Sequence, residues 1–224
     1  MDTEYWLKRW REGRTGWHHA EVMPLLAGHW PGLDAPAGSR VLVPLCGKSV
    51  DMLWFSRRGM HVLGVDVSPV AIESFLAENH LHARTRSGAD GIHYAITNSP
   101  GGGEIEIING DIFSIDPATL AGCNALYDRA GTIALPAASR ERLAREVYVK
   151  LPAGSHGLLI ALDYPEGEMQ GPPFSVDEAE VHRLFGSHWS IDLLERRDIL
   201  ASQTSFFEQG VTALHTGVYA LGKL

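Results

Sequence analysis

Residues 40–68 read RVLVPLCGKSVDMLWFSRRGMHVLGVDVS, and this stretch decides the fold. It contains an apolar run at 41–43, a tight turn at 44–48, a helical segment, and a second apolar run at 61–65 closed by Asp66. This order predicts a βαβ unit. In such a unit the turn approaches a ligand, and an acid about 20 residues further on accepts hydrogen bonds from ribose hydroxyls. The spacing of Gly47 and Asp66 fits a nucleoside site of this kind.

The turn narrows the choice of nucleoside. A dinucleotide site needs a G-x-G-x-x-G turn, whereas residues 44–48 contain one glycine, so NAD and FAD do not fit. Gly47-Lys48-Ser49 is similar to the end of a phosphate-binding P-loop, but that motif needs an earlier glycine where Leu42 and Val43 stand. The common nucleoside without phosphates is S-adenosylmethionine. The alternative is an α/β turn that binds no ligand.

The composition indicates one compact domain that handles a small molecule. The chain has 224 residues, 45% of them hydrophobic, and a net charge of −8. Because Lys and Arg are not clustered, we expect no nucleic acid partner. No apolar run is long enough to span a bilayer and no signal-peptide pattern is present, so we expect a cytoplasmic protein with no membrane partner. Nothing in the sequence demands a partner subunit, and we expect a monomer.

Strand and helix patterns alternate along the chain, which predicts a mostly parallel sheet with helices on both faces. We expect an N-terminal helical cover over residues 1–38 and an α/β core over 39–224. Ser68-Pro69 predicts the start of a helix that runs to about residue 78. Two apolar alternations between residues 92 and 108 predict a hairpin or a strand with a loose loop. Further helices are predicted over 18–29, 50–58, 137–150 and 176–185, and further strands over 123–128, 158–162, 189–194 and 211–221.

Several motifs together resemble the bacterial thiopurine S-methyltransferases. The most specific is the Pro44-Leu45-Cys46-Gly47-Lys48-Ser49-x-Asp51 turn, since ordinary methyltransferases carry a glycine-rich first turn. The other matching motifs are Trp6-x-x-x-Trp10, Gly16-Trp17-His18, Gly64-Val65-Asp66-x-Ser68, Gly110-Asp111-x-Phe113, Tyr127-Asp128-Arg129 and Gly171-Pro172-Pro173-Phe174. The resemblance covers nearly the whole chain. It implies a single-domain, class I (Rossmann-like) S-adenosylmethionine-dependent methyltransferase with a seven-stranded sheet and an N-terminal helical lid.

The resemblance also implies roles for individual residues. Arg129 is the catalytic candidate, and Trp17 and Phe174 are candidates for substrate contact. The residues implied in cofactor binding are Trp10, Leu45, Gly47, Asp66, Asp111, Ile112 and Arg129. Asp66, Asp111 and Arg129 each follow a predicted strand, at the edge where open α/β sheets bind ligands.

Other interpretations of these residues stay open. Asp111 could cap a turn with Asn109, and Trp6 and Trp10 could be core residues. Arg129 could pair with Asp128 or Asp163.

The chain departs from the family at three places. Asp66 stands where glutamate is frequent, and Gly131 where a bulkier residue is usual. Some relatives place a further arginine near the active site in the C-terminal segment, whereas the last arginine here is Arg197 and residues 206–209 contain none.

The expected reaction is transfer of the sulfonium methyl group to a small aromatic or heterocyclic thiol, with S-adenosylhomocysteine as the other product. Such thiols are more acidic than cysteine, whose pKa is about 8.5, so no base is assigned. Adjacent His18 and His19 lack metal-ligand spacing, and Cys46 and Cys123 are expected to be free, so no metal is expected. Selenium or tellurium species, or another nucleophile, are alternative acceptors. A non-catalytic S-adenosylmethionine-binding protein is the further alternative.

Overall fold

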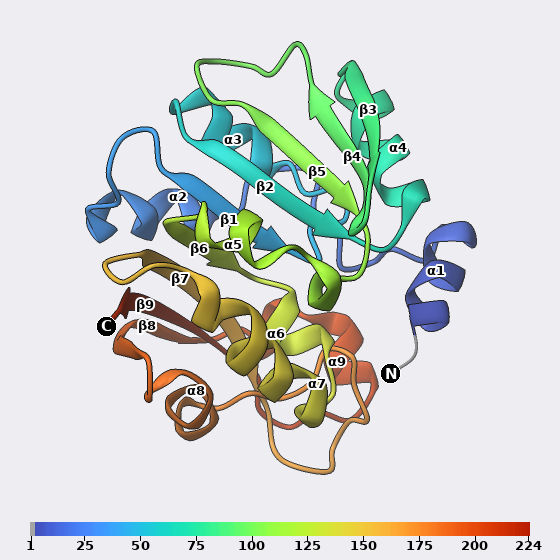
Figure 1. The fold of residues 1–224 in the computed structure, drawn as a ribbon. Coiled ribbons are helices and arrows are strands. Elements are labelled where there is room, and N and C mark those ends of the chain that lie inside the picture. Colours follow the sequence, from blue (N-terminus) through green and yellow to red (C-terminus); the bar gives the residue numbers. More distant parts are fainter. Residues whose placement is uncertain (1–2) are drawn as a thin grey trace.

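The computed structural model describes residues 3–224, whose strands form one nine-stranded sheet of order β3-β4-β5-β2-β1-β6-β7-β9-β8 (Figure 1). The strands are β1 (Arg40–Pro44), β2 (His61–Asp66), β3 (Ala83–Gly88), β4 (Gly91–Ile96), β5 (Ile105–Asn109), β6 (Ala125–Asp128), β7 (His156–Asp163), β8 (Trp189–Asp198) and β9 (His215–Lys223). Strands β1 and β2 pair in parallel in the register Val41 to Val62, as the βαβ pattern predicts.

The α/β prediction is confirmed, with two corrections. The sheet has nine strands where seven were expected, and it is mixed. The five central strands pair with one another in parallel, in the order β5, β2, β1, β6 and β7. At the two edges each strand pairs antiparallel with its neighbour: β4 with β5 and β3 with β4 on one side, and β9 with β7 and β8 with β9 on the other. The sequence does not predict β3, because its residues ARTRSG are mostly exposed and show no apolar alternation. The β4–β5 hairpin is confirmed.

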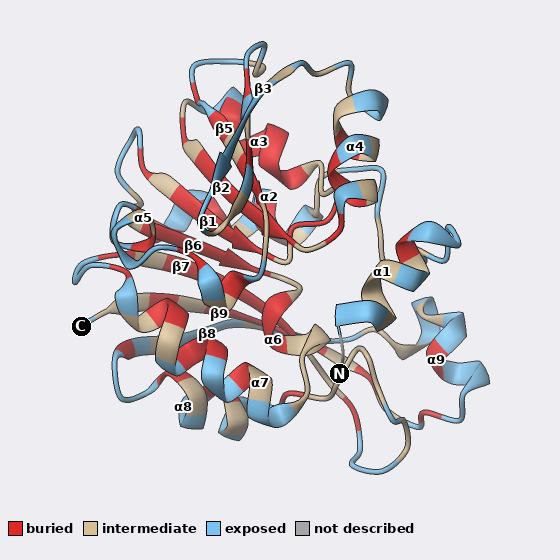
Figure 2. Ribbon diagram, turned by 45° about the vertical axis from the view of Figure 1, so that its right-hand side comes forward, coloured by how far each residue is buried: buried red, intermediate tan, exposed pale blue. Residues whose placement is uncertain are grey.

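Helices cover both faces of the sheet and also the edge at the carboxyl ends of its parallel strands. They are α1 (Thr3–Arg11), α2 (Pro24–His29), α3 (Asp51–Arg57), α4 (Pro69–Glu78), α5 (Pro117–Ala121), α6 (Gly131–Ala134), α7 (Ala137–Arg142), α8 (Glu178–Phe185) and α9 (Thr204–Glu208). Side chains along β1 alternate between two buried clusters: Val41 and Val43 join the cluster with α2, α3 and α4, and Leu42 joins the cluster with α5 and α8. Figure 2 shows the buried residues concentrated on the central strands and the helices packed against them.

Two of the predicted helices differ from those in the structure. The helix expected over 18–29 begins at Pro24, because proline fits the first helical position and residues 18–23 are irregular. The helix expected over 137–150 is α7 followed by a π-helical turn (Leu143–Val147) and a 3₁₀ turn (Tyr148–Lys150). The helix start at Ser68-Pro69 is confirmed, since the Ser68 Oγ accepts a hydrogen bond from the Ala71 N–H.

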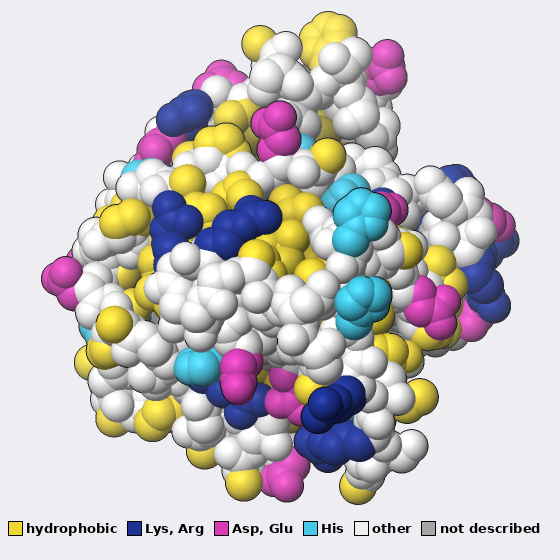
Figure 3. All heavy atoms as spheres, turned by 90° about the horizontal axis from the view of Figure 1, so that it is seen from above, with side chains coloured by type: hydrophobic (Ala, Val, Ile, Leu, Met, Phe, Trp, Pro, Cys, Tyr) yellow, Lys and Arg dark blue, Asp and Glu magenta, His cyan; other side chains and the backbone are white. Residues whose placement is uncertain are grey.

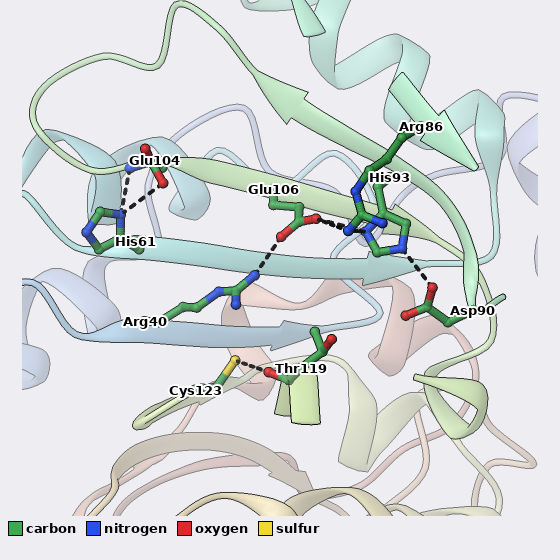
Figure 4. Close-up of polar contacts among 9 residues, drawn as sticks. All are labelled: Arg40, His61, Arg86, Asp90, His93, Glu104, Glu106, Thr119 and Cys123. Atoms are coloured by element: carbon green, nitrogen blue, oxygen red, sulfur yellow. Dashed lines mark hydrogen bonds and ion pairs between the residues drawn. The ribbon is translucent and has the colours of Figure 1, made fainter. Parts of the chain in front are cut away.

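The buried His93 side chain of β4 links the strands β3, β4 and β5 at the antiparallel edge of the sheet (Figure 4). His93 Nδ1 lies 2.8 Å from Glu106 Oε1, and Nε2 lies 2.7 Å from Asp90 Oδ1. Arg40, from β1, donates to the other Glu106 oxygen at 2.6 Å. Burial by itself raises the pKa of Glu106, but the hydrogen bond with His93 and the charge of Arg40 lower it overall.

Charged groups of both signs are spread over the molecular surface. On the face seen in Figure 3, Lys and Arg side chains lie in several separate places, with acidic side chains among them. In residues 3–224, no helix combines the length and the apolar character needed to cross a membrane.

Candidate functional site

A cavity of about 1060 Å³ opens at the carboxyl ends of the parallel strands. The turn after β1, Asp66 at the end of β2 and Arg129 just after β6 all line it. Residues of α1, the loop after α1 and α9 close its other sides. Figure 1 shows α1 beside α4, at the end of the sheet toward which the arrows of β2 and β5 point. Three segments that are far apart in the sequence therefore meet at one sheet edge.

The turn after β1 has an unusual backbone. Leu45 has a φ of 49° and Gly47 a φ of 53°, so both lie in the left-handed region. A Cβ atom at Gly47 would lie 3.0 Å from Trp10 Cζ2, which leaves room for glycine and for little else. A left-handed leucine costs free energy, and such strain persists where the surrounding structure fixes it. Leu45, Gly47 and their neighbours in this turn line the cavity.

The Asp66 carboxylate holds this turn against β2. Its Oδ2 accepts from the Gly47 N–H at 2.7 Å and its Oδ1 from the Ser68 N–H at 2.8 Å. Burial raises the pKa of Asp66 to about 6, although the two backbone N–H groups act in the opposite direction. Each carboxylate oxygen can accept more than one hydrogen bond, so Asp66 keeps acceptor capacity for a hydroxyl in the cavity.

Three tryptophans build one wall of the cavity. The ring of Trp17 makes edge contacts with Trp6 and Trp10, with ring centroids 5.2 Å and 5.8 Å apart. The Arg9 guanidinium lies 5.0 Å from the Trp17 ring centroid and donates to the Tyr5 hydroxyl at 3.2 Å. Trp10 is 7% exposed, which agrees with the interpretation of Trp10 as a core residue. It also lines the cavity, and its contact with a cofactor stays a prediction.

Arg129 points to a partner that the sequence did not suggest. Its Nη1 donates to Asp51 Oδ2 at 3.3 Å. The two partners considered from the sequence, Asp128 and Asp163, are bonded elsewhere. Asp128 accepts from Thr132 and Tyr148, and Asp163 pairs with Arg196. Arg129 therefore keeps its position at the cavity while paired to an acid from α3.

Three candidate residues do not line the cavity. Asp111 caps a short 3₁₀ turn (Ile112–Ser114) by accepting from the Phe113 N–H at 3.0 Å, which agrees with the capping interpretation. Ile112 is buried in the core cluster on the α5 side of the sheet. The Phe174 ring packs over Gly171 and lies 5.5 Å from the Arg140 guanidinium, while its neighbours Pro172 and Pro173 line the cavity. Contacts of Asp111, Ile112 and Phe174 with a ligand stay predictions.

Several residues at the cavity were given no role from the sequence. His18 and His19 both line it, because residues 18–23 form an irregular segment with a bend at residues 20–21 rather than a helix. Burial first, and then the nearby positive side chains, lower the pKa of both histidines. Arg197 also lines the cavity and pairs with Glu195, so an arginine from the C-terminal part of the chain does reach it. Within residues 3–224, no three His, Cys, Asp or Glu side chains group in a way that could hold a metal ion.

The residues at the cavity fit S-adenosylmethionine. Ligand pockets span roughly 300–1,000 Å³, and the cavity, at about 1060 Å³, is at the upper end of this range. The glycine turn and the Asp66 carboxylate suit the amino acid end and the ribose hydroxyls of such a cofactor.

Comparison with known proteins gives a consistent result. The family model for thiopurine S-methyltransferase matches residues 1–224. A thiopurine S-methyltransferase of Xanthomonas campestris pv. campestris is 52% identical over 221 residues, which cover 99% of this chain and 99% of the relative. One of Bordetella parapertussis is 50% identical over 224 residues, 100% of both chains.

Solved structures share the fold at low sequence identity. The Burkholderia thailandensis 1,6-didemethyltoxoflavin-N1-methyltransferase, with bound 1,6-didemethyltoxoflavin and S-adenosylhomocysteine, has a TM-score of 0.63 and 15% identity, covering 99% of this chain and 86% of its own. A structure from work on the conversion of a disulfide bond into a thioacetal group during echinomycin biosynthesis has a TM-score of 0.66 and 16% identity, covering 99% and 92%. The chain therefore has the fold of these proteins.

Proposed function

Because the chain belongs to the thiopurine S-methyltransferase family, we propose that its cavity holds S-adenosylmethionine beside a small aromatic or heterocyclic thiol and that the protein methylates the thiol sulfur. The observation that carries this proposal is the cavity of about 1060 Å³, which brings together the turn after β1, Asp66, Arg129 and two tryptophans. We assign the turn and Asp66 to the cofactor, and Arg129 and Trp17 to the acceptor. Trp10 lies against Gly47 and in edge contact with Trp17, so it touches both sets.

On the cofactor side, the protein binds and orients. The left-handed turn at Leu45 and Gly47 presents backbone groups to the amino acid end of the cofactor, and Asp66 accepts from the ribose hydroxyls. When bound, S-adenosylmethionine supplies an electrophilic methyl group on a sulfonium. We propose that Asp111 and Ile112 contact the adenine edge, although neither is among the residues that line the cavity.

On the acceptor side, Arg129 and the tryptophans hold the thiol. One guanidinium N–H group of Arg129 is bonded to Asp51, which leaves further N–H donors for a thiolate or a ring nitrogen. A flat ring gains from contact with the Trp10 and Trp17 rings. The proton leaves the thiol before transfer, because an aromatic thiol is more acidic than the cysteine value of about 8.5. The reaction thus needs neither a dedicated base nor a metal ion.

The N-terminal cover, residues 3–38, excludes water in this proposal. Trp6, Arg9 and Trp10 of α1 lie at the cavity together with Phe206 of α9. Figure 2 shows α1 and α9 near each other, with exposed residues on their outer sides. A closed wall strengthens the attraction between Arg129 and an anionic sulfur, because water no longer screens it.

The test is transfer of a labelled methyl group from S-adenosylmethionine to 6-mercaptopurine, thiophenol, selenite and catechol. We expect turnover on the two aromatic thiols, unaffected by a chelator, and a loss of at least about 10-fold in Arg129→Ala, or about 1.4 kcal/mol. Lys150→Ala, which removes a positive charge outside the cavity lining, is the matched control. Turnover on selenite or catechol alone would move the acceptor to another class. Cofactor binding without any turnover would support a binding protein.

A further inference from the structure

Asp51 is a buried acid that joins the N-terminal cover to the arginine of the site. It is the first residue of α3 and is 1% exposed. Its Oδ1 accepts from the Met23 backbone N–H at 2.8 Å. Its Oδ2 accepts from the Tyr127 hydroxyl at 2.9 Å and from Arg129 Nη1 at 3.3 Å. One carboxylate thus receives donors from the cover, from β6 and from the loop after β6.

The carboxylate is held in one orientation. The backbone N–H of Asp51 donates to Ser49 Oγ at 3.3 Å. Tyr127 is fixed in turn, since its ring packs against Phe55 and Trp30 with centroids 5.5 Å and 6.5 Å away. A buried ionised carboxylate is costly unless donors satisfy it, so each donor that is lost weakens the placement of the others.

Arg129 depends on this carboxylate for its position. Among the described residues, Asp51 is the acid with which Arg129 forms an ion pair. The Arg129 side chain is 22% exposed at the cavity, and a long side chain without an anchor samples many rotamers. The pair holds one end of the guanidinium and leaves its remaining N–H groups for the acceptor.

Met23 ties the same carboxylate to the cover. Met23 is the N-cap residue of α2, and its backbone N–H donates to Asp51 Oδ1. Val22, Met23 and Pro24 all line the cavity. The Asp51 carboxylate therefore binds this part of the cover through one oxygen and Arg129 through the other.

We propose that Asp51 is a positioning residue that couples docking of the N-terminal end of α2 to the orientation of Arg129. The proposal rests on the proposed function for its kinetic part only. When the Met23 bond is made, the carboxylate faces Tyr127 and Arg129 and the guanidinium is fixed; when that bond is lost, Arg129 loses its fixed orientation. The acceptor arginine is then correctly placed only while Met23 is bonded to Asp51.

The test uses Asp51→Asn in the full chain. The amide has nearly the same shape, but its oxygen can satisfy either Met23 or the Tyr127 and Arg129 pair, and its NH₂ group then faces a donor. Asp163→Asn is the matched control, because Asp163 is also paired to an arginine but lies outside the cavity lining. Asp51→Glu restores the charge, and it serves as the second variant if Asp51→Asn does not fold.

Two measurements need no turnover. We expect amide hydrogen exchange in the unliganded protein to become at least about 10-fold faster across residues 17–29 in Asp51→Asn, which corresponds to about 1.4 kcal/mol of local stability. We also expect the Arg129 Nε–H signal, assigned by its loss in Arg129→Lys, to shift or broaden. Asp163→Asn should change neither, and Asp51→Glu should recover part of both. Unchanged exchange and an unchanged Arg129 signal in Asp51→Asn would overturn the proposal.

Kinetics then separates positioning from a general loss of stability. We expect kcat to fall at least about 10-fold in Asp51→Asn while the dissociation constant of S-adenosylhomocysteine changes less than about 3-fold. Combined with Arg129→Lys, the two losses should be far from additive, because both act through one guanidinium. Additive losses would overturn the coupling. If the native protein turned over none of the thiols, the proposed function would fail, while the exchange and Arg129 signal would still decide the role of Asp51.

Discussion

Asp66 predicts how cofactor affinity depends on pH. Burial raises the pKa of its carboxyl to about 6 in the unliganded protein. If ribose hydroxyls donate to the carboxylate, the ligand binds the ionised form, and the pKa of Asp66 in the complex is lower. The affinity for S-adenosylhomocysteine must then fall as the pH drops below about 6, because a growing fraction of the protein has to lose a proton before it binds.

The magnitude follows from the fraction ionised. With a pKa of about 6, about nine in ten molecules carry a protonated Asp66 at pH 5, and about one in ten at pH 7. The apparent dissociation constant is the intrinsic one divided by the competent fraction. It should therefore rise about 10-fold between pH 7 and pH 5, or about 1.4 kcal/mol. Close to pH 6, binding should release about half a proton.

Isothermal titration with S-adenosylhomocysteine at pH 5, 6 and 7, in two buffers with different heats of ionisation, measures both quantities. Asp66→Asn is the control, because His18 and His19 also line the cavity and contribute any pH dependence that remains in this variant. Loss of the fold at low pH does not arise from Asp66. Since its pKa is raised on folding, its ionisation costs stability above about pH 6, and protonation removes that cost. Equal affinities at pH 5 and 7 in the native protein would refute the reasoning.

Three further predictions concern the turn, the sheet edge and a helix start. Gly47→Ala should weaken S-adenosylhomocysteine binding at least about 10-fold by calorimetry, because its φ is 53° and the added Cβ would lie 3.0 Å from Trp10. Gly167→Ala, with a φ of 83° in open space, carries similar backbone strain and should leave binding unchanged; equal losses in both would contradict the steric argument. His93→Asn should lower the free energy of unfolding in urea by about 1–3 kcal/mol at pH 7, since Glu106 and Asp90 lose their shared partner. Because His93 lowers the pKa of Glu106, the stability it provides is present above the ordinary Glu range and is lost as the pH falls through the lowered pKa, so the difference should shrink at acid pH. His61→Asn, at an exposed pair with Glu104, should stay within about 0.5 kcal/mol, and an equal loss there would argue against the buried network. Ser68→Ala should cost about 1 kcal/mol in the same assay, because Ser68 Oγ caps α4; no change would mean that Asp66, which also binds the Ser68 N–H, holds the helix start alone.

The parts of the fold that the sequence predicted depend on local patterns. The βαβ unit follows from two apolar runs, a turn and an acid within 29 residues, 40–68. The start of α4 follows from the adjacent Ser68 and Pro69. Strand β3 lacks such a pattern, because its exposed residues become a strand only through pairing with β4. The local sequence pattern of β3 does not show that β4 will pair with it, because strand propensity depends on such neighbours.

Among the site residues too, some follow from local sequence patterns and others depend on tertiary packing. Leu45, Gly47, Asp66 and Arg129 lie at strand ends, where the sheet architecture alone places ligand contacts. Asp51 stands within the matching turn motif, yet its partners Met23, Tyr127 and Arg129 are 28, 76 and 78 residues away. Only tertiary packing brings them together, so no spacing rule reveals the bond. The positions of His18 and His19 depend likewise on where α2 begins.

The division between strand ends and cover also explains how one sheet serves different acceptors. In the proposed function, the cofactor side of the cavity consists of β1, β2 and the turn between β1 and α3, and parallel pairing fixes the backbone of the two strands. The proposed acceptor side is formed by α1, the loop after it and the segment near α9, none of which belongs to the sheet. Side chains there can change without disturbing the strands. A relative of the same fold, at 15% identity, is an N-methyltransferase, so the sheet does not set the acceptor atom. Acceptor choice in this protein should therefore respond to substitutions in residues 5–19 and 203–209 far more than to substitutions in the strands.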